Sequence, residues 1–96
     1  MEYLRKTSSE CIGIFITSDK CYDNVEWTYG YRESDRLGGK DPYSGSKGAA
    51  ELVIKSYFES FLSRLAPKIK IGVGRAGNVI GGGDWAPFPI LPDCVR

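Results

Sequence analysis

The hydrophobic positions of the chain form two strand-like patterns, one on each side of a helical one. Residues 11–16 are continuously apolar and rich in β-branched side chains, a pattern typical of a parallel strand buried on both faces. Residues 69–73 alternate apolar with other positions, which predicts a second short strand. Residues 1–8 are expected to hold the end of a helix, because Arg5 and Lys6 suit a last helical turn.

Between the two strands, the apolar positions follow helical spacing. Asp41 suits the N-cap of a helix and Pro42 its first turn. The helix is expected to run to about Leu65, before Pro67. Its apolar positions are Ala50, Val53, Ile54, Tyr57, Phe58, Phe61, Leu62 and Leu65. A strand, a long connection with a helix, and a strand predict an α/β fold with a βαβ unit and two parallel strands.

Three other stretches have no strand or long-helix pattern. Residues 20–41 lack clean periodicity, and a stretch of that length in a compact domain is usually functional or mobile. Residues 75–85 read as a glycine-rich loop, and residues 90–96 as the start of a further helix. Ligands of open α/β sheets bind beyond the carboxyl ends of the strands. The polar cluster 17–20 and the loop 75–85 are both expected at that edge.

Composition and charge limit the possible classes. Ninety-six residues suffice for one small domain, and 42% hydrophobic with 26% charged residues argues against disorder. A net charge of +1 excludes a strong basic footprint for nucleic acid or an anionic membrane. No apolar run is long enough to span a bilayer, and the N-terminus has no secretory signal pattern. Three cysteines without a CxxC pair, and no histidine, argue against a metal site and predict free thiols in the cytoplasm.

Tyr43 and Lys47 are the first candidates for chemistry. Four residues apart on a helix, they share a face. An ammonium group beside a phenol favours the phenolate, which can exchange a proton with a substrate hydroxyl. The pair alone is a weak signal, since the chain has six tyrosines. Its place in the first turn of a long helix strengthens it, as do small neighbours that let a flat ligand approach: Ser44, Gly45, Ser46 and Gly48.

Three further motifs each have a functional and a simpler interpretation. The cluster 17–20 contains two hydroxyls, a carboxylate and an amine. Taken alone, it is typical of a solvated turn. Together with Tyr43 on the next element, it favours a proton-transfer site. Residues 72–77 match G-x-G-x-x-G, yet no helix is expected after them, so we reject a dinucleotide fingerprint. Residues 81–85 (Gly-Gly-Gly-Asp-Trp) suit either a phosphate cradle or a flexible turn, and both interpretations stay open.

Three segments together resemble a known family: residues 16–24, 38–52 and 75–85. They are similar to the CDP-glucose 4,6-dehydratases, a branch of the extended short-chain dehydrogenase/reductases. Lys20 stands where the related dTDP-glucose and GDP-mannose dehydratases have glutamate, which favours the CDP-glucose branch. The resemblance implies part of a Rossmann-like, doubly wound sheet. Residues 1–96 would be the central part of an NAD-binding dehydratase domain, without its N-terminal dinucleotide motif and its C-terminal substrate domain.

The resemblance also implies an NAD cofactor, a CDP-glucose substrate and the product CDP-4-keto-6-deoxyglucose. Tyr43 would take the proton of the sugar 4-hydroxyl, and Lys47 would bind the nicotinamide ribose. Ser18 would hydrogen-bond the 4-oxygen, Asp19 would protonate the departing 6-hydroxyl, and Lys20 would be the C5 base. Cofactor contacts are expected from Tyr43, Lys47, Ala76, Gly77 and Val79, and substrate contacts from Ser18 and Asn78. The full-length enzyme is expected to be a homo-oligomer without nucleic-acid or membrane partners.

Two other interpretations remain open at this point. One is a truncated, catalytically inactive chain; the other is a sugar-nucleotide epimerase, which shares the Tyr-Lys pair but lacks the Asp-Lys pair. Phe88 and Pro89 depart from the family pattern, which has an acidic-basic pair there, and put one substrate contact in doubt. The 96 residues alone are expected to be inactive, not to bind NAD and to aggregate, because one long helix cannot cover both faces of a sheet.

Overall fold

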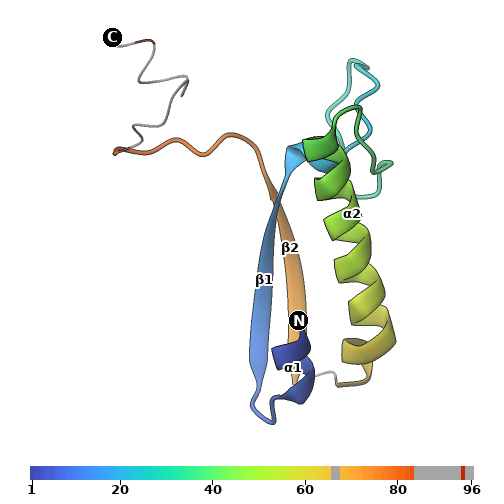
Figure 1. Cartoon of the computed structure of the whole chain (residues 1–96), viewed down its shortest axis with the longest axis vertical. Coiled ribbons are helices and arrows are strands. Elements are labelled where there is room, and N and C mark those ends of the chain that lie inside the picture. The colour runs from blue at the N-terminus through green and yellow to red at the C-terminus, as the bar shows by residue number, and fades with distance from the viewer. Residues whose placement is uncertain (66–67, 84–93, 95–96) are drawn as a thin grey trace.

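The described residues form a two-stranded parallel sheet with helices packed on one face (Figure 1). The computed structural model describes residues 1–65, 68–83 and 94. The main elements are α1 (Glu2–Lys6), β1 (Cys11–Ser18), α2 (Pro42–Tyr57) and β2 (Ile69–Ala76). The register runs from Cys11 opposite Ile69 to Ser18 opposite Ala76, so the carboxyl ends of both strands lie side by side. The predicted βαβ unit is confirmed.

The long helix begins where its sequence predicts. The Asp41 side chain caps it by accepting a hydrogen bond from the Ser44 amide, and Pro42 occupies the first turn. The predicted continuous α-helix to Leu65 is wrong for its last part. The chain forms a π-helical turn over Phe58–Leu62 and a 3-10 turn over Ser63–Leu65. Apolar spacing does not distinguish these turns from an α-helix, because all of them keep the same side of the chain toward the sheet.

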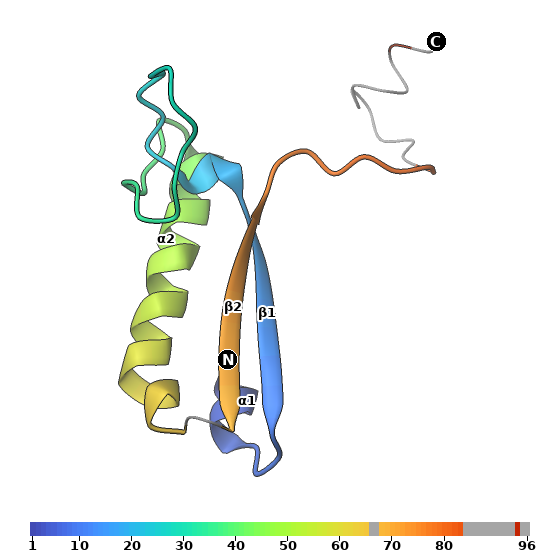
Figure 2. The ribbon, with the colours of Figure 1, turned by 180° about the vertical axis from the view of Figure 1, so that it is seen from behind.

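The two faces of β1 differ, although its sequence is apolar throughout. Its odd-numbered residues face the helices, as Gly13 does beside Leu4 of α1. Ile12, Ile14 and Ile16 point to the other face and are 69%, 62% and 69% exposed. The expectation of a strand covered on both faces is therefore wrong for the described residues, whereas the expected uncovered face is confirmed. In both Figure 1 and Figure 2, α2 lies to one side of the two strands, and no helix of the described chain lies on the opposite side.

The apolar core lies at the amino ends of the strands. Leu4, Leu62 and Ile69 form its buried centre. Around them pack the partly buried side chains of Met1, Cys11, Phe15, Tyr57, Phe58, Leu65 and Ile71. The carboxyl ends of the strands lie outside this cluster, so other interactions must hold the elements together there.

Residues 20–41 are largely irregular, as predicted. A single 3-10 turn spans Asp19–Cys21, and one isolated antiparallel bridge joins Tyr22 to Leu37. Gly72 and Gly74 lie inside β2 rather than in a loop before a helix, which confirms the rejection of a dinucleotide fingerprint. Four predictions fall outside the described residues: Pro67 as helix stop, a loop role for 84–85, the departure at 88–89 and a helix over 90–96. Within the described part of the chain, no helix is long and apolar enough to cross a membrane.

Candidate active site

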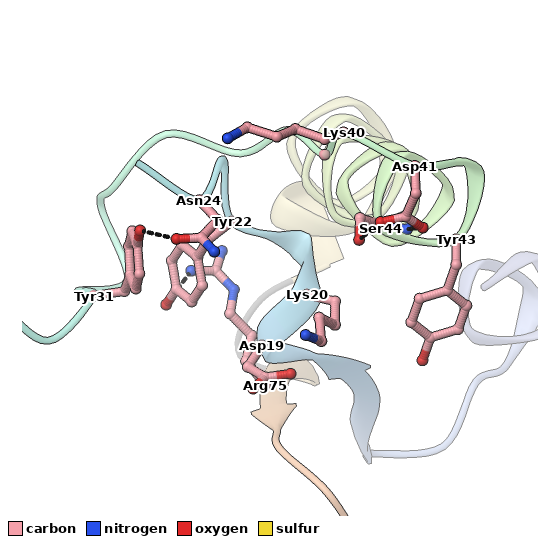
Figure 3. A pocket seen from close by; sticks show the side chains of 11 residues that line it. Asp19, Lys20, Tyr22, Asn24, Tyr31, Lys40, Asp41, Tyr43, Ser44 and Arg75 are labelled. Carbon is pink, nitrogen blue, oxygen red and sulfur yellow. Dashed lines mark hydrogen bonds between the residues drawn. The ribbon is translucent and has the colours of Figure 1, made fainter. Parts of the chain in front are cut away.

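A pocket of about 720 Å³ opens beyond the carboxyl end of β1, beside the start of α2. Parallel α/β units place their ligand sites at this edge. The pocket is lined by Asp19, Lys20, Tyr22, Asn24, Tyr31, Gly39, Lys40, Asp41, Tyr43, Ser44 and Arg75. In the view of Figure 3, Tyr43 lies on one side of Lys20, and Tyr22 and Tyr31 lie on the other.

The end of β1 positions the first group of candidate residues. Ser18 closes the strand and is only 8% exposed. Its hydroxyl accepts a hydrogen bond from the Lys20 amide at 3.2 Å and donates one to Asp19 Oδ1 at 3.2 Å. These bonds make the tight turn that directs Asp19 and Lys20 into the pocket rather than along the strand. A carboxylate and an amine therefore reach the same space from adjacent positions.

The first turns of α2 position the second group. Tyr43 is 56% exposed and points into the pocket. The Lys47 ammonium lies 5.4 Å from the centre of the Tyr43 ring, one turn further along the same face. The side-chain and backbone hydrogen bonds from Ser44 hold the pKa of Asp41 below its usual range, so this cap is ionised at neutral pH. The structure thus places Tyr43 and Lys47 side by side on α2, as their spacing predicts.

The remaining predicted site residues lie around the end of β2. Ala76 pairs with Ser18 in the sheet, and a side chain at Gly77 would lie 3.6 Å from Asp19 Oδ2, so both are close to the first group. Asn78 and Val79 do not line the pocket. They belong to the segment that leaves β2 and runs away from α2 in both Figure 1 and Figure 2.

A buried ion pair beneath the pocket was not predicted from the sequence. Glu51 of α2 is 5% exposed and binds Arg75 near the end of β2. Burial opposes the ionisation of Glu51, but hydrogen bonds from Arg75 and Thr17 outweigh it and lower the pKa of this carboxyl. The Glu51 hydrogen bonds likewise raise the pKa of Arg75. The two residues lie 24 positions apart on different elements, so no local spacing in the sequence indicates their pairing.

The arrangement suits proton transfer at several atoms of one small ligand. A phenol from α2 faces a carboxylate and an amine from the end of β1 across a single pocket. These groups can accept or donate protons, and they come from the 3-10 turn after β1 and from the first turn of α2. Among the described residues, no cluster of histidine, cysteine or acidic side chains could hold a metal ion.

Comparison with known proteins gives the site a context. The chain is 58% identical to the CDP-glucose 4,6-dehydratase of Salmonella typhimurium over 85 residues, or 84% of this chain. The chain is related to the sugar-nucleotide 4,6-dehydratases. It is also 26% identical to a dTDP-D-glucose 4,6-dehydratase of Dictyostelium discoideum over 99% of its length, and 32% identical to an uncharacterised Schizosaccharomyces pombe protein over 71%. No protein-family model matches the chain.

The similarity to the dehydratases covers only part of those proteins. The chain spans 23% of the length of the Salmonella dehydratase and 20% of the Dictyostelium one. The resemblance drawn from residues 16–24, 38–52 and 75–85 is thereby confirmed for this stretch of sequence. A dehydratase activity and its substrate are properties of whole proteins, and for this chain they are proposals.

Proposed function

We propose that the protein carrying this chain is a sugar-nucleotide 4,6-dehydratase that converts CDP-glucose to CDP-4-keto-6-deoxyglucose. Residues 1–96 would form the central part of its NAD-binding domain. One observation carries the proposal: Asp19 and Lys20 from the end of β1 line the same pocket as Tyr43 from α2. This brings three groups suited to proton transfer around one ligand space, in a sequence 58% identical to a CDP-glucose dehydratase.

The first half of the reaction uses Tyr43 and Ser18. Tyr43, as phenolate, accepts the proton of the sugar 4-hydroxyl while the C4 hydrogen leaves as hydride, which makes C4 a ketone. Ser18 donates a hydrogen bond to the 4-oxygen from the end of β1. Its hydroxyl now bonds Asp19 and would turn toward the sugar. The 4-ketone acidifies the C5 hydrogen, because the carbanion formed there is stabilised as an enolate.

The second half removes water across C5 and C6. Lys20, in its uncharged form, accepts the C5 proton, and the C6–oxygen bond breaks. Asp19, in its protonated form, gives its proton to the departing 6-hydroxyl, which leaves as water. Both side chains line the pocket from adjacent positions, so they can serve adjacent carbons of one sugar. An epimerase has no use for this second pair of groups, which favours the dehydratase.

The residues present fit a nicotinamide cofactor. Lys47 lies beside Tyr43, and none of the described acidic residues forms an ion pair with it, which leaves its ammonium available for ribose hydroxyls. Further contacts would come from Tyr43 and from the backbone of Ala76, Gly77 and Val79, and Asn78 would contact the substrate. NAD, when bound, would supply the hydride acceptor for C4 and the hydride donor for C6. The Lys20 ammonium, which exchanges its protons with solvent, would return a proton to C5.

Two observations support cytidine diphosphate as the nucleotide of the substrate. Identity is 58% to the CDP-glucose enzyme of Salmonella and 26% to the dTDP-glucose enzyme of Dictyostelium. Lys20, where glutamate is expected for the dTDP-glucose and GDP-mannose enzymes, points the same way. We therefore expect turnover of CDP-glucose in preference to dTDP-glucose.

The test is turnover of CDP-glucose by the full-length protein that carries this sequence. Tyr43→Phe removes the proton acceptor and keeps the ring, and should lower turnover about 100-fold or more. Tyr29→Phe is the matched control, because Tyr29 is 77% exposed and does not line the pocket. Near-normal turnover by Tyr43→Phe, with nucleotide binding retained in both variants, would contradict the proposal.

A further inference from the structure

Arg75 joins four parts of the fold at the carboxyl end of the sheet. It lies in β2, next to the last residue of the strand, and is 17% exposed. Its Nε and Nη2 atoms each donate a hydrogen bond of 3.1 Å to Glu51 on α2. The hydroxyl of Thr17 on β1 also donates to Glu51. Both strands and the long helix therefore meet at one buried carboxylate.

The fourth part is the irregular segment 22–37, which forms a wall of the pocket. The Nη1 atom of Arg75 donates to the Tyr22 hydroxyl at 2.9 Å and to the backbone oxygen of Glu33 at 3.0 Å. The guanidinium carbon also lies 4.8 Å from the centre of the Tyr22 ring, a cation–π contact. One side chain thus binds the segment at two points, near its beginning and near its end.

Few other hydrogen bonds of the described residues attach segment 22–37 to the rest of the chain, one being that of the Tyr22 amide to the Asp19 oxygen. Within the described residues, the side-chain hydrogen bonds that join this segment to β2 are the two from Arg75 to Tyr22 and Glu33, and none joins it to α2. The segment has internal order: the Tyr22 and Tyr31 rings stack at 5.0 Å, and the Val25 amide donates to the Tyr31 hydroxyl at 2.9 Å. The segment therefore resembles a small preformed unit held to the sheet at one place.

We propose that Arg75 is a positioning residue that fastens segment 22–37 over the carboxyl end of the sheet. Through Tyr22 it holds the aromatic stack, and Asn24 is held in turn because it accepts a hydrogen bond from the Tyr31 hydroxyl at 2.8 Å. Figure 3 shows these three side chains on the side of the pocket opposite Tyr43, with Arg75 behind Tyr22. Arg75 thereby sets the distance between this wall and the start of α2.

Arg75 has two functions, pairing with Glu51 of α2 and binding segment 22–37, and substitutions can separate them. Lysine keeps the positive charge beside Glu51, but its single ammonium cannot reproduce the fork that also reaches Tyr22 and Glu33. Arg75→Lys is therefore expected to keep α2 packed on the sheet and to release the segment. Arg75→Met removes both functions. Tyr22→Phe keeps the buried pair with Glu51 and deletes only one of the two bonds to the segment.

Amide hydrogen exchange, read by mass spectrometry on the full-length protein, measures both functions at once. Peptides from residues 22–37 report on the segment, where Asp23 donates to the Arg36 oxygen and Val25 to the Tyr31 hydroxyl. Peptides from residues 42–57 report on α2. In Arg75→Lys we expect exchange about 10-fold faster or more in 22–37, since hydrogen bonds to a charged group are lost, and less than about 2-fold faster in 42–57.

Two results support the proposal and two would overturn it. Compared with Arg75→Met, Arg75→Lys should restore most of the protection of α2 from exchange but not the protection of residues 22–37. Tyr22→Phe should raise the exchange rate less than Arg75→Lys does, and only in residues 22–37. Unchanged exchange of 22–37 in both Arg75→Lys and Tyr22→Phe would overturn it, as would an equal rise in both peptides of Arg75→Lys. Tyr22→Phe decides the question if an Arg75 variant does not fold. No substrate is needed, so this result is independent of the proposed activity.

Discussion

Gly39 lies directly against the first turn of α2, and replacing it with alanine should displace that turn. A Cβ atom at Gly39 would lie 2.4 Å from Ser44 Cβ, 2.5 Å from the Gly45 nitrogen and 2.6 Å from the Ser44 carbonyl carbon. Ordinary contacts of this kind are about 3.5–4.0 Å. Two of the three atoms belong to the backbone, so a rotamer change cannot relieve the clash. The loop must move about 1 Å from the helix.

The structure gives the expected size of this effect. Overpacking of this kind costs about 1–3 kcal/mol. The displacement also disturbs the cap, in which Asp41 Oδ1 accepts from the Ser44 amide at 3.0 Å and Oδ2 from the Ser44 hydroxyl at 2.6 Å, and loss of a cap costs about 1 kcal/mol. Together, Gly39→Ala should lower the free energy of unfolding by about 2–4 kcal/mol. Tyr43 would shift with the turn, so turnover should fall as well.

Gly45→Ala is the matched control for Gly39→Ala. Gly45 lies in the same turns of α2, but a Cβ atom there meets nothing within 4 Å. Alanine favours a helix interior over glycine by about 1 kcal/mol, so this variant should be slightly more stable. Urea unfolding followed by circular dichroism measures both free energies on the full-length protein. A Gly39→Ala protein as stable as the wild type, or a Gly45→Ala protein equally destabilised, would refute the reasoning.

Three further predictions concern the pocket, the uncovered face of the sheet and the buried ion pair. Lys20→Ala should abolish incorporation of solvent deuterium at C5 of the sugar, and incorporation at the normal rate would show that Lys20 is not the base. Ile14→Lys places a charge in the middle of the uncovered sheet face and should reduce self-association of the 96-residue chain on sizing; unchanged association would contradict this. Glu51→Gln should cost about 2–3 kcal/mol, because Arg75 loses its buried anion. Because folding lowers the pKa of Glu51, the ionised carboxylate stabilises the folded state fully above about pH 4.5, and this stabilisation is lost as the pH falls through the lowered pKa. The difference in the free energy of unfolding between wild type and Glu51→Gln should therefore shrink in acid.

The meeting of Asp19, Lys20 and Tyr43 at one pocket was predictable from the sequence, because it depends on local motifs and one topological rule. The turn after β1 carries Asp19 and Lys20, and the cap at Asp41 fixes where α2 begins and hence where Tyr43 lies. Parallel strands with a helix between them bring the end of the first strand and the start of the helix to the same edge. No long-range detail was needed to predict that these groups meet.

Two features were not predicted from the sequence: the buried ion pair and the π-helical turn. The pairing of Glu51 with Arg75 spans 24 residues and needs the exact alignment of α2 against β2 to be known. The π-helical turn over Phe58–Leu62 keeps the apolar spacing of an α-helix, so its pattern is indistinguishable. The exposure of Ile14 followed from counting elements rather than from the apolar pattern of the strand, because one long helix covers only one face of the sheet.

The most direct test of the proposed dehydratase site follows one hydrogen atom through the reaction. The full-length protein is incubated with CDP-glucose carrying deuterium at C4, and the product is analysed by mass spectrometry and nuclear magnetic resonance. The mechanism predicts a 4-keto-6-deoxy sugar with the deuterium at C6 and a solvent-derived hydrogen at C5. A 4-epimer without loss of water, or no conversion by a folded protein that binds NAD, would contradict the assignment of Asp19, Lys20 and Tyr43 to a 4,6-dehydratase site.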